Sequence, residues 1–266
     1  MIEQTVDLPR SGKSMEIFVA HPDEGGPFPP VIMYMDMWGM REVLRDLARR
    51  VATVGYCCVL PDFYYRGGRV RYAEQDDARL GKSFDDVAPG RQSALRSAMD
   101  GLSDAMVVED TEALLQYLDG CDWVRPGPIG AIGYCMGGRH ALCVSGKFSE
   151  RVRATACIHG AYLANGNADS PHLIARRARG EIYLGHAEND RYAAADVAAT
   201  VSAALEGCAL RARSVVHKQA QHAYAIPDRD VFDKHAANRD WEHIFAMLRR
   251  QVAGQGPVAA AVSTQT

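Results

Sequence analysis

The segment that most constrains the fold of this chain is residues 130–139, with the sequence GAIGYCMGGR. It joins an apolar run to a helix-compatible stretch and places Cys135 between Gly133 and Gly137. At a sharp strand-to-helix turn, side chains on either flank would crowd the residue at the tip, so glycines are favoured there. The pattern predicts a buried strand, a tight turn that presents a thiol, and a helix whose N-terminus favours negative charge on the sulfur.

Glycine-rich turns of this kind also bind nucleotides, and cysteines are often simply buried. The run lacks the first Gly-x-Gly pair of a dinucleotide fingerprint and the Gly-Lys-Ser/Thr ending of a P-loop. Cysteine is among the most buried residue types, so packing alone is an alternative explanation for Cys135. The rest of the chain has to decide between a nucleophile and a packed thiol.

Composition indicates one α/β domain that does not bind nucleic acid or membrane. The chain has 266 residues, 47% of them hydrophobic and 24% charged, and no linker rich in Pro, Gly or Ser divides it. We expect a single domain over residues 1–252 and a disordered tail over 253–266. The net charge of −3, with acids and bases interspersed, provides no electrostatic footprint for nucleic acid or an anionic membrane.

Cysteine usage and the N-terminus favour a cytoplasmic protein with reduced thiols. The seven cysteines show no paired spacing, and residues 1–10 lack the apolar core of a signal peptide. No apolar run approaches the length of a transmembrane helix. Neither a Cys-x-x-Cys nor a His-Glu-x-x-His motif occurs, so we expect no metal and no cofactor.

Apolar runs alternate with segments of helical period along the chain. Residues 31–35 and 56–60 are continuous apolar runs, and the apolar residues between them follow the i, i+3, i+4, i+7 spacing of an amphipathic helix. Strand–helix–strand order predicts a mostly parallel sheet with helices on both faces. Further strands are expected at 3–8, 16–21, 129–134, 155–158, 181–184 and 211–217, and further helices at 103–118, 197–205 and 241–248.

Residues 63–102 interrupt this alternation. They are polar, rich in Gly, Arg and Asp, and weakly periodic. A long excursion in a compact domain is usually a lid or a binding loop. We expect a lid-like insertion here, with a surface insertion of no function as the alternative.

Four polar residues follow the ends of expected strands: Asp36, Cys135, Asp190 and His222. Functional groups of an open α/β sheet collect at the carboxyl ends of its strands. The last three occur in the order nucleophile, acid, histidine, each after its own strand, which is the order of α/β-hydrolases. His222 would accept or share the thiol proton and Asp190 would hold the imidazole tautomer. Taken singly, Asp190 could be a helix N-cap and His222 an ordinary surface histidine, but their joint placement favours a triad.

An oxyanion hole is expected beside the thiol. The backbone N–H of Met136 follows the nucleophile directly, and the loop after the third strand would supply a second N–H, that of Met37. Two backbone donors at this place would stabilise a tetrahedral intermediate.

These motifs resemble the dienelactone hydrolase family of the α/β-hydrolase superfamily, over about residues 14–250. The resemblance implies a Cys135–Asp190–His222 triad that hydrolyses lactones or small esters without a metal or cofactor. The cysteine elbow is its specific part, because related esterases and lipases use serine. The resemblance is carried by MDMWG at 35–39, PDFYYR at 61–66, GYCMGGR at 133–139, the loop 185–190 and HAY at 222–224.

The resemblance also implies roles around the triad. Family members of the best-known type carry glutamate at the place of Asp36, where it contacts the resting thiol and takes part in its activation. They hold a substrate carboxylate with arginines, for which Arg66 and Arg229 are the candidates here. Arg69 and Arg91 are further candidates near the expected pocket mouth, and the expected apolar walls are Trp38, Tyr64 and Tyr65.

We therefore expect a hydrolase that cleaves dienelactone-type lactones or small esters through a thioacyl intermediate on Cys135. A broad carboxylesterase or thioesterase with the same triad is the alternative enzyme. A non-catalytic protein that senses oxidants through Cys135 is the alternative from another class. The expected partner is a small-molecule substrate, and the expected state is a monomer or homodimer.

Overall fold

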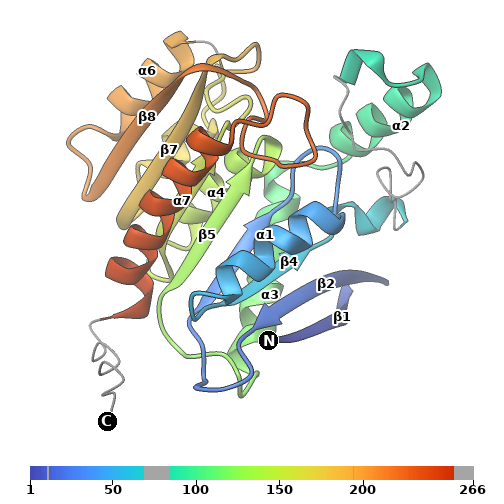
Figure 1. Cartoon of the computed structure of the whole chain (residues 1–266), viewed down its shortest axis with the longest axis vertical. Helices are drawn as coiled ribbons and strands as arrows, with labels where there is room; N and C mark the ends of the chain where they lie inside the picture. Colours follow the sequence, from blue (N-terminus) through green and yellow to red (C-terminus); the bar gives the residue numbers. More distant parts are fainter. Residues whose placement is uncertain (11, 69–83, 194, 255–266) are drawn as a thin grey trace, which may run out of the picture.

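The computed structural model describes residues 1–10, 12–68, 84–193 and 195–254 (Figure 1). Eight strands form one sheet: β1 (Ile2–Arg10), β2 (Lys13–His21), β3 (Pro30–Tyr34), β4 (Cys57–Pro61), β5 (Ile129–Tyr134), β6 (Val152–Ile158), β7 (Gly180–Asn189) and β8 (Leu210–Gln221). Their order is β1-β2-β4-β3-β5-β6-β7-β8. β1 and β2 form an antiparallel hairpin, β2 is antiparallel to β4, and the remaining neighbours are parallel.

Burial follows the sequence pattern of each strand. Every residue of β3, β4 and β5 is buried, which is why these strands are continuous apolar runs. β1 lies at the edge of the sheet, and its residues alternate between exposed and partly buried. The sequence prediction of a mostly parallel sheet is confirmed.

Helices cover both faces of the sheet. In Figure 1, α1 (Glu42–Ala52) and α7 (Lys234–Leu248) lie on the near face, and α3 (Asp104–Asp119) and α4 (Met136–Lys147) lie on the far face. The other helices are α2 (Pro89–Asp100), α5 (Pro171–Ala175) and α6 (Ala195–Leu205). None of these helices is long and apolar enough to cross a membrane, as far as the described residues go.

Helix boundaries have the local causes that the sequence suggests. Ser103 caps α3 by accepting a hydrogen bond from the Met106 N–H at 3.2 Å, and Gly120 follows its last residue. The buried face of α1 is made by the expected apolar residues, Leu44, Leu47, Ala48 and Val51. Helix α1 therefore packs on the sheet through its predicted apolar face.

The insertion contains more regular structure than the sequence suggests. Residues 63–67 form a short 3-10 helix and α2 occupies residues 89–100. The sequence did not predict α2, because Leu95 is its one buried residue in the described part of the chain and a single buried residue leaves no apolar stripe. Figure 1 shows α2 beyond one end of the sheet. Arg69, one of the candidate substrate anchors, lies outside the described residues.

Residues 249–253 form a π-helical turn after α7, so regular structure continues one residue into the expected tail, and residues 255–266 lie outside the described residues.

Candidate active site

The turn between β5 and α4 is the tight elbow that the glycine pattern predicts. Cys135 has φ 53° and ψ −117°, a strained conformation for a residue with a side chain. A Cβ at Gly133 would lie 2.0 Å from the carbonyl oxygen of Gly137, and one at Gly137 would lie 2.2 Å from that of Tyr34. Both glycines are therefore required for the elbow to pack against its own helix and against β3.

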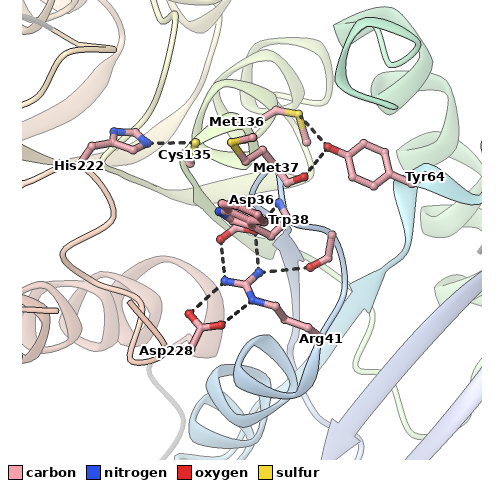
Figure 2. A network of polar contacts seen from close by, with 10 residues as sticks. Asp36, Met37, Trp38, Arg41, Tyr64, Cys135, Met136, His222 and Asp228 are labelled. Atoms are coloured by element: carbon pink, nitrogen blue, oxygen red, sulfur yellow. Dashed lines mark hydrogen bonds and ion pairs between the residues drawn. The ribbon is translucent and has the colours of Figure 1, made fainter. Parts of the chain in front are cut away.

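The structure brings the three predicted triad residues together. His222 Nε2 lies 3.1 Å from Cys135 Sγ (Figure 2). His222 Nδ1 lies 2.8 Å from Asp190 Oδ2. Each residue directly follows a parallel strand, β5, β7 or β8, so the carboxyl edge of the sheet places them side by side.

Asp190 is held by the backbone as well as by the histidine. Its Oδ1 accepts hydrogen bonds from the N–H groups of Tyr192, at 2.8 Å, and Ala193, at 3.2 Å. Its other oxygen remains for His222, so the cap-like contacts and the triad contact use different atoms. The ring of Tyr192 also packs edge-on against the imidazole, with centroids 4.7 Å apart. Nothing in the sequence pointed to this contact except the position of Tyr192 two residues after Asp190.

The environment of His222 favours its charged form. Burial disfavours an imidazolium, but the neighbouring Cys135 sulfur and the hydrogen bond to Asp190 outweigh it and raise the pKa of His222 to about 10. A positive imidazolium beside the sulfur favours the thiolate, which is the nucleophilic form of cysteine. An imidazolium–thiolate pair is the form in which a cysteine acts as a nucleophile near neutral pH.

Met37 and Met136 lie beside the thiol, where the oxyanion hole was predicted. Met136 is the first residue of α4, so its N–H is not used within the helix. The Tyr64 hydroxyl donates to the Met37 carbonyl at 2.9 Å and lies 3.8 Å from Met136 Sδ (Figure 2). Tyr64, predicted as a substrate wall, therefore joins the two segments that carry the candidate N–H groups.

Asp36, the residue expected to modulate the thiol, is hydrogen-bonded to Arg41 through both of its oxygens, and the described residues show no hydrogen bond between it and the thiol. The guanidinium donates to Asp36 Oδ1 at 2.7 Å and to Oδ2 at 2.9 Å (Figure 2). It also donates to Asp228 at 2.7 Å, and Arg41 is only 2% exposed. We call these three residues the Asp36–Arg41–Asp228 clamp. Aspartate is one methylene shorter than glutamate, and its partner lies five residues further along the same loop.

Arg66 is also placed differently from the prediction. It donates to the fully buried Asp110 of α3 at 2.5 and 2.8 Å, and its guanidinium stacks on the Tyr65 ring at 4.6 Å. Tyr65 itself donates to Asp110 at 2.9 Å. A buried carboxylate requires such donors, so Arg66 and Tyr65 serve Asp110 and lie outside the hollow at Cys135. Arg91 lies on α2 and does not line that hollow either.

A cavity of about 360 Å³ opens at the thiol. Cys135, His222 and Trp38 line it together with two arginines, Arg229 and Arg191. The Arg229 guanidinium lies over the Trp38 ring at 4.9 Å. Of the predicted substrate contacts, the structure therefore brings Trp38 and Arg229 to the thiol.

The fold and its edge residues define the class of this protein. An eight-stranded, mostly parallel sheet with helices on both faces and an elbow after β5 is the α/β-hydrolase fold. The model of the dienelactone hydrolase family matches residues 15–252. The chain belongs to this family and is a hydrolase of lactones or esters.

Individual relatives agree with the family. A protein of Synechocystis sp. named "Putative carboxymethylenebutenolidase" is 24% identical over 250 residues, which cover 93% of this chain and 96% of that one. A Bradyrhizobium protein named "Probable 2-oxo-3-(5-oxofuran-2-ylidene)propanoate lactonase" is 22% identical, with 95% and 96% covered. The crystal structure titled "Putative Dienelactone Hydrolase" from Klebsiella pneumoniae has a TM-score of 0.79 at 23% identity and covers 94% of this chain and 98% of its own. At that identity it supports the fold alone.

Proposed function

We propose that this protein hydrolyses a lactone or small ester by nucleophilic catalysis, with Cys135, His222 and Asp190 as a catalytic triad. The observation that carries the proposal is the unbroken chain of contacts from Asp190 to the imidazole and from the imidazole to the sulfur, at 2.8 and 3.1 Å. The same thiol lies at the tip of a strained elbow and borders a cavity. A cysteine kept only for packing needs none of these features.

In the first half-reaction the thiolate attacks the carbonyl carbon and forms the C–S bond. The carbonyl π electrons move to oxygen, and the N–H groups of Met136 and Met37 donate to this oxyanion. When the intermediate collapses, the C–O bond to the alcohol breaks and the imidazolium Nε2–H of His222 protonates the leaving oxygen. The product is an alcohol, or the open-chain alcohol arm of a lactone, and a thioester on Cys135.

In the second half-reaction water cleaves the thioester. Neutral His222 takes a proton from the water as the oxygen attacks the carbonyl carbon, and the same N–H groups receive the second oxyanion. Collapse breaks the C–S bond, releases the carboxylic acid and restores the thiolate beside the imidazolium. Asp190 stabilises the imidazolium in both halves and holds the ring orientation.

The relatives and the cavity suggest the substrate. The Bradyrhizobium relative carries a name that specifies a lactone with a free carboxylate. Arg229 lines the cavity at Cys135, and a guanidinium binds a carboxylate by two parallel hydrogen bonds. We propose Arg229 as the anchor for such a carboxylate, with the Trp38 ring as the adjacent apolar wall.

Hydrolysis of p-nitrophenyl acetate and of a dienelactone tests the proposal. We expect Cys135→Ala to abolish turnover, His222→Ala to come close to abolishing it, and Asp190→Asn to lower kcat by about 10²- to 10⁴-fold. Cys208→Ala is the matched control, because Cys208 lies in the turn after α6 and should retain activity. Full activity in Cys135→Ala would refute the mechanism. Alkylation of Cys135 without any turnover in the wild type would favour the thiol sensor.

A further inference from the structure

A second hollow, of about 290 Å³, also borders Cys135. Met99 of α2, Met136 and Arg139 of α4, and Ala161 and Tyr162 after β6 line it. It shares four lining residues with the first hollow: Met37, Phe84, Cys135 and Tyr192. The sulfur therefore borders both hollows, which adjoin each other at these four residues.

The geometry of ester cleavage assigns a role to each hollow. The leaving oxygen must lie near the protonated Nε2 of His222, and the first hollow contains His222. The second hollow contains Met136, and His222 is not among its described lining residues. In Figure 2, His222 and Met136 lie on either side of the Cys135 sulfur. With the oxyanion at the N–H groups of Met136 and Met37, the remaining substituent of the carbonyl carbon points to the second hollow.

We infer that the second hollow binds the acyl group of an open-chain ester, while the first binds the alcohol. This inference rests on the proposed function. The acyl and alcohol arms of a small lactone belong to one ring and need only one hollow. A second hollow at the same sulfur is of use to a substrate whose two arms diverge from the carbonyl carbon.

The lining of the second hollow suits an apolar acyl chain. Three thioethers, of Met37, Met99 and Met136, adapt to chains of different length. The charged residues of the lining are Arg96, Arg139 and Asp100, and Asp100 is exposed at the C-terminal end of α2. The two cations already have partners. Arg139 donates to Asp104 at 2.9 Å, and the Arg96 guanidinium lies over the Phe84 ring at 4.9 Å.

The segment after β6 is built to form a wall there. Ala161 N–H donates to the Cys135 carbonyl at 3.1 Å, which ties this wall to the elbow. Tyr162 has φ 55°, a strained conformation for an aromatic residue, and 52% of it remains exposed. Its ring meets that of Tyr192 edge-on at 6.1 Å. A role in binding the acyl group would account for a strained and exposed tyrosine this close to Cys135.

The test compares kcat/KM for p-nitrophenyl acetate, butyrate and hexanoate, which differ only in the acyl chain. For the wild type we expect the ratio of butyrate to acetate to be about tenfold, because two further methylenes are buried. Met99→Trp fills the second hollow and should reduce the hexanoate-to-acetate ratio to about one. Met99→Ala, which crowds nothing and suits a helix, should lower that ratio several-fold by removing contacts with the chain.

Val231→Trp is the matched substitution in the first hollow. Val231→Trp should leave the hexanoate-to-acetate ratio of kcat/KM near that of the wild type. Methyl and butyl acetate vary the alcohol instead, and the variant should lower the butyl-to-methyl ratio of kcat/KM. A flat acyl series in the wild type, or equal effects of Met99→Trp and Val231→Trp on both series, would overturn the inference. Hydrolysis of a dienelactone without hydrolysis of any open-chain ester would overturn it while leaving the triad intact. Activity in Cys135→Ala would instead refute the proposed function.

Discussion

Asp36 and Arg41 form a buried bidentate ion pair, with hydrogen bonds of 2.7 and 2.9 Å. The same guanidinium reaches Asp228, in the loop that follows His222. The Asp36–Arg41–Asp228 clamp thus joins the loop that carries Met37 to the loop that carries the histidine. It connects one half of the proposed oxyanion hole with the proposed base.

Removal of Arg41 should affect both folding and catalysis. We expect Arg41→Ala to lower the free energy of unfolding by about 3–5 kcal/mol, because it leaves buried carboxylates without their counter-charge. It should also lower kcat more than it raises KM. Arg151→Ala, which breaks a largely exposed pair with Asp119, should cost less than about 1 kcal/mol. Urea unfolding and steady-state kinetics measure both variants, and equal effects of the two would contradict the role of the clamp.

Asp36 should have little influence on the ionisation of the thiol. Its charge is already compensated by Arg41, while His222 contacts the sulfur directly. The rate of iodoacetamide labelling against pH should therefore be nearly the same for the wild type and Asp36→Asn. His222→Ala should move the same curve to higher pH, because the imidazolium that favours the thiolate is gone. A shift in Asp36→Asn as large as that in His222→Ala would mean that the carboxylate does act on the thiol.

Tyr224 should position the His222 loop through Asp240. Asp240 of α7 is 2% exposed. It accepts hydrogen bonds from the hydroxyls of Tyr224, at 2.7 Å, and Tyr183, at 2.6 Å, and lies 2.6 Å from His217 Nε2. Tyr224→Phe removes the link that lies two residues from His222, whereas Tyr183→Phe removes an equivalent hydrogen bond on β7.

Both tyrosine variants should lose about 1.5–3 kcal/mol of stability, the usual range for a hydrogen bond to a charged group. Only Tyr224→Phe should lower kcat appreciably at a nearly unchanged KM. Thermal or urea unfolding, together with kcat and KM for both variants, separates a positioning role from a merely structural one. Equal losses of kcat in the two variants would assign Tyr224 to stability alone.

Acid should destabilise the fold partly through His140. His140 lies on α4 and is fully buried, and this burial, with a smaller contribution from the positive charge of Arg139, lowers the pKa of its imidazole to about 3. Between that value and the ordinary pKa near 6.5 the unfolded chain binds a proton that the folded chain does not, so stability falls as pH falls. The slope is up to about 1.4 kcal/mol per pH unit. Urea unfolding at pH 7, 6 and 5 should show a shallower dependence in His140→Gln, and parallel curves for the two proteins would contradict this origin.

Much of the fold is readable from local sequence. The strands β3, β4 and β5 are largely apolar and buried at every residue, because they are covered on both faces, and β6 and β7 each contain a shorter apolar core. The relation between Cys135, Asp190 and His222 was also accessible, because each residue follows a strand and the order is informative. The structure brings these side chains together as expected.

The orientation of charged side chains was less accessible, because their partners are distant in sequence. Asp36 pairs with Arg41, which also binds the distant Asp228. Arg66 pairs with Asp110 of α3. Such partners depend on the tertiary fold and leave no periodic signal. Helix α2 was missed for a related reason, since it buries little and therefore lacks an apolar stripe.

The proposed thioester on Cys135 would be directly observable. The wild type is mixed with excess p-nitrophenyl butyrate, quenched in acid within milliseconds and analysed by intact-mass and peptide mass spectrometry. We predict a butyryl adduct on the peptide that contains Cys135, sensitive to hydroxylamine and absent from Cys135→Ala, which should also lack turnover. Rapid turnover with no adduct on Cys135, or undiminished turnover in Cys135→Ala, would contradict nucleophilic catalysis by this thiol.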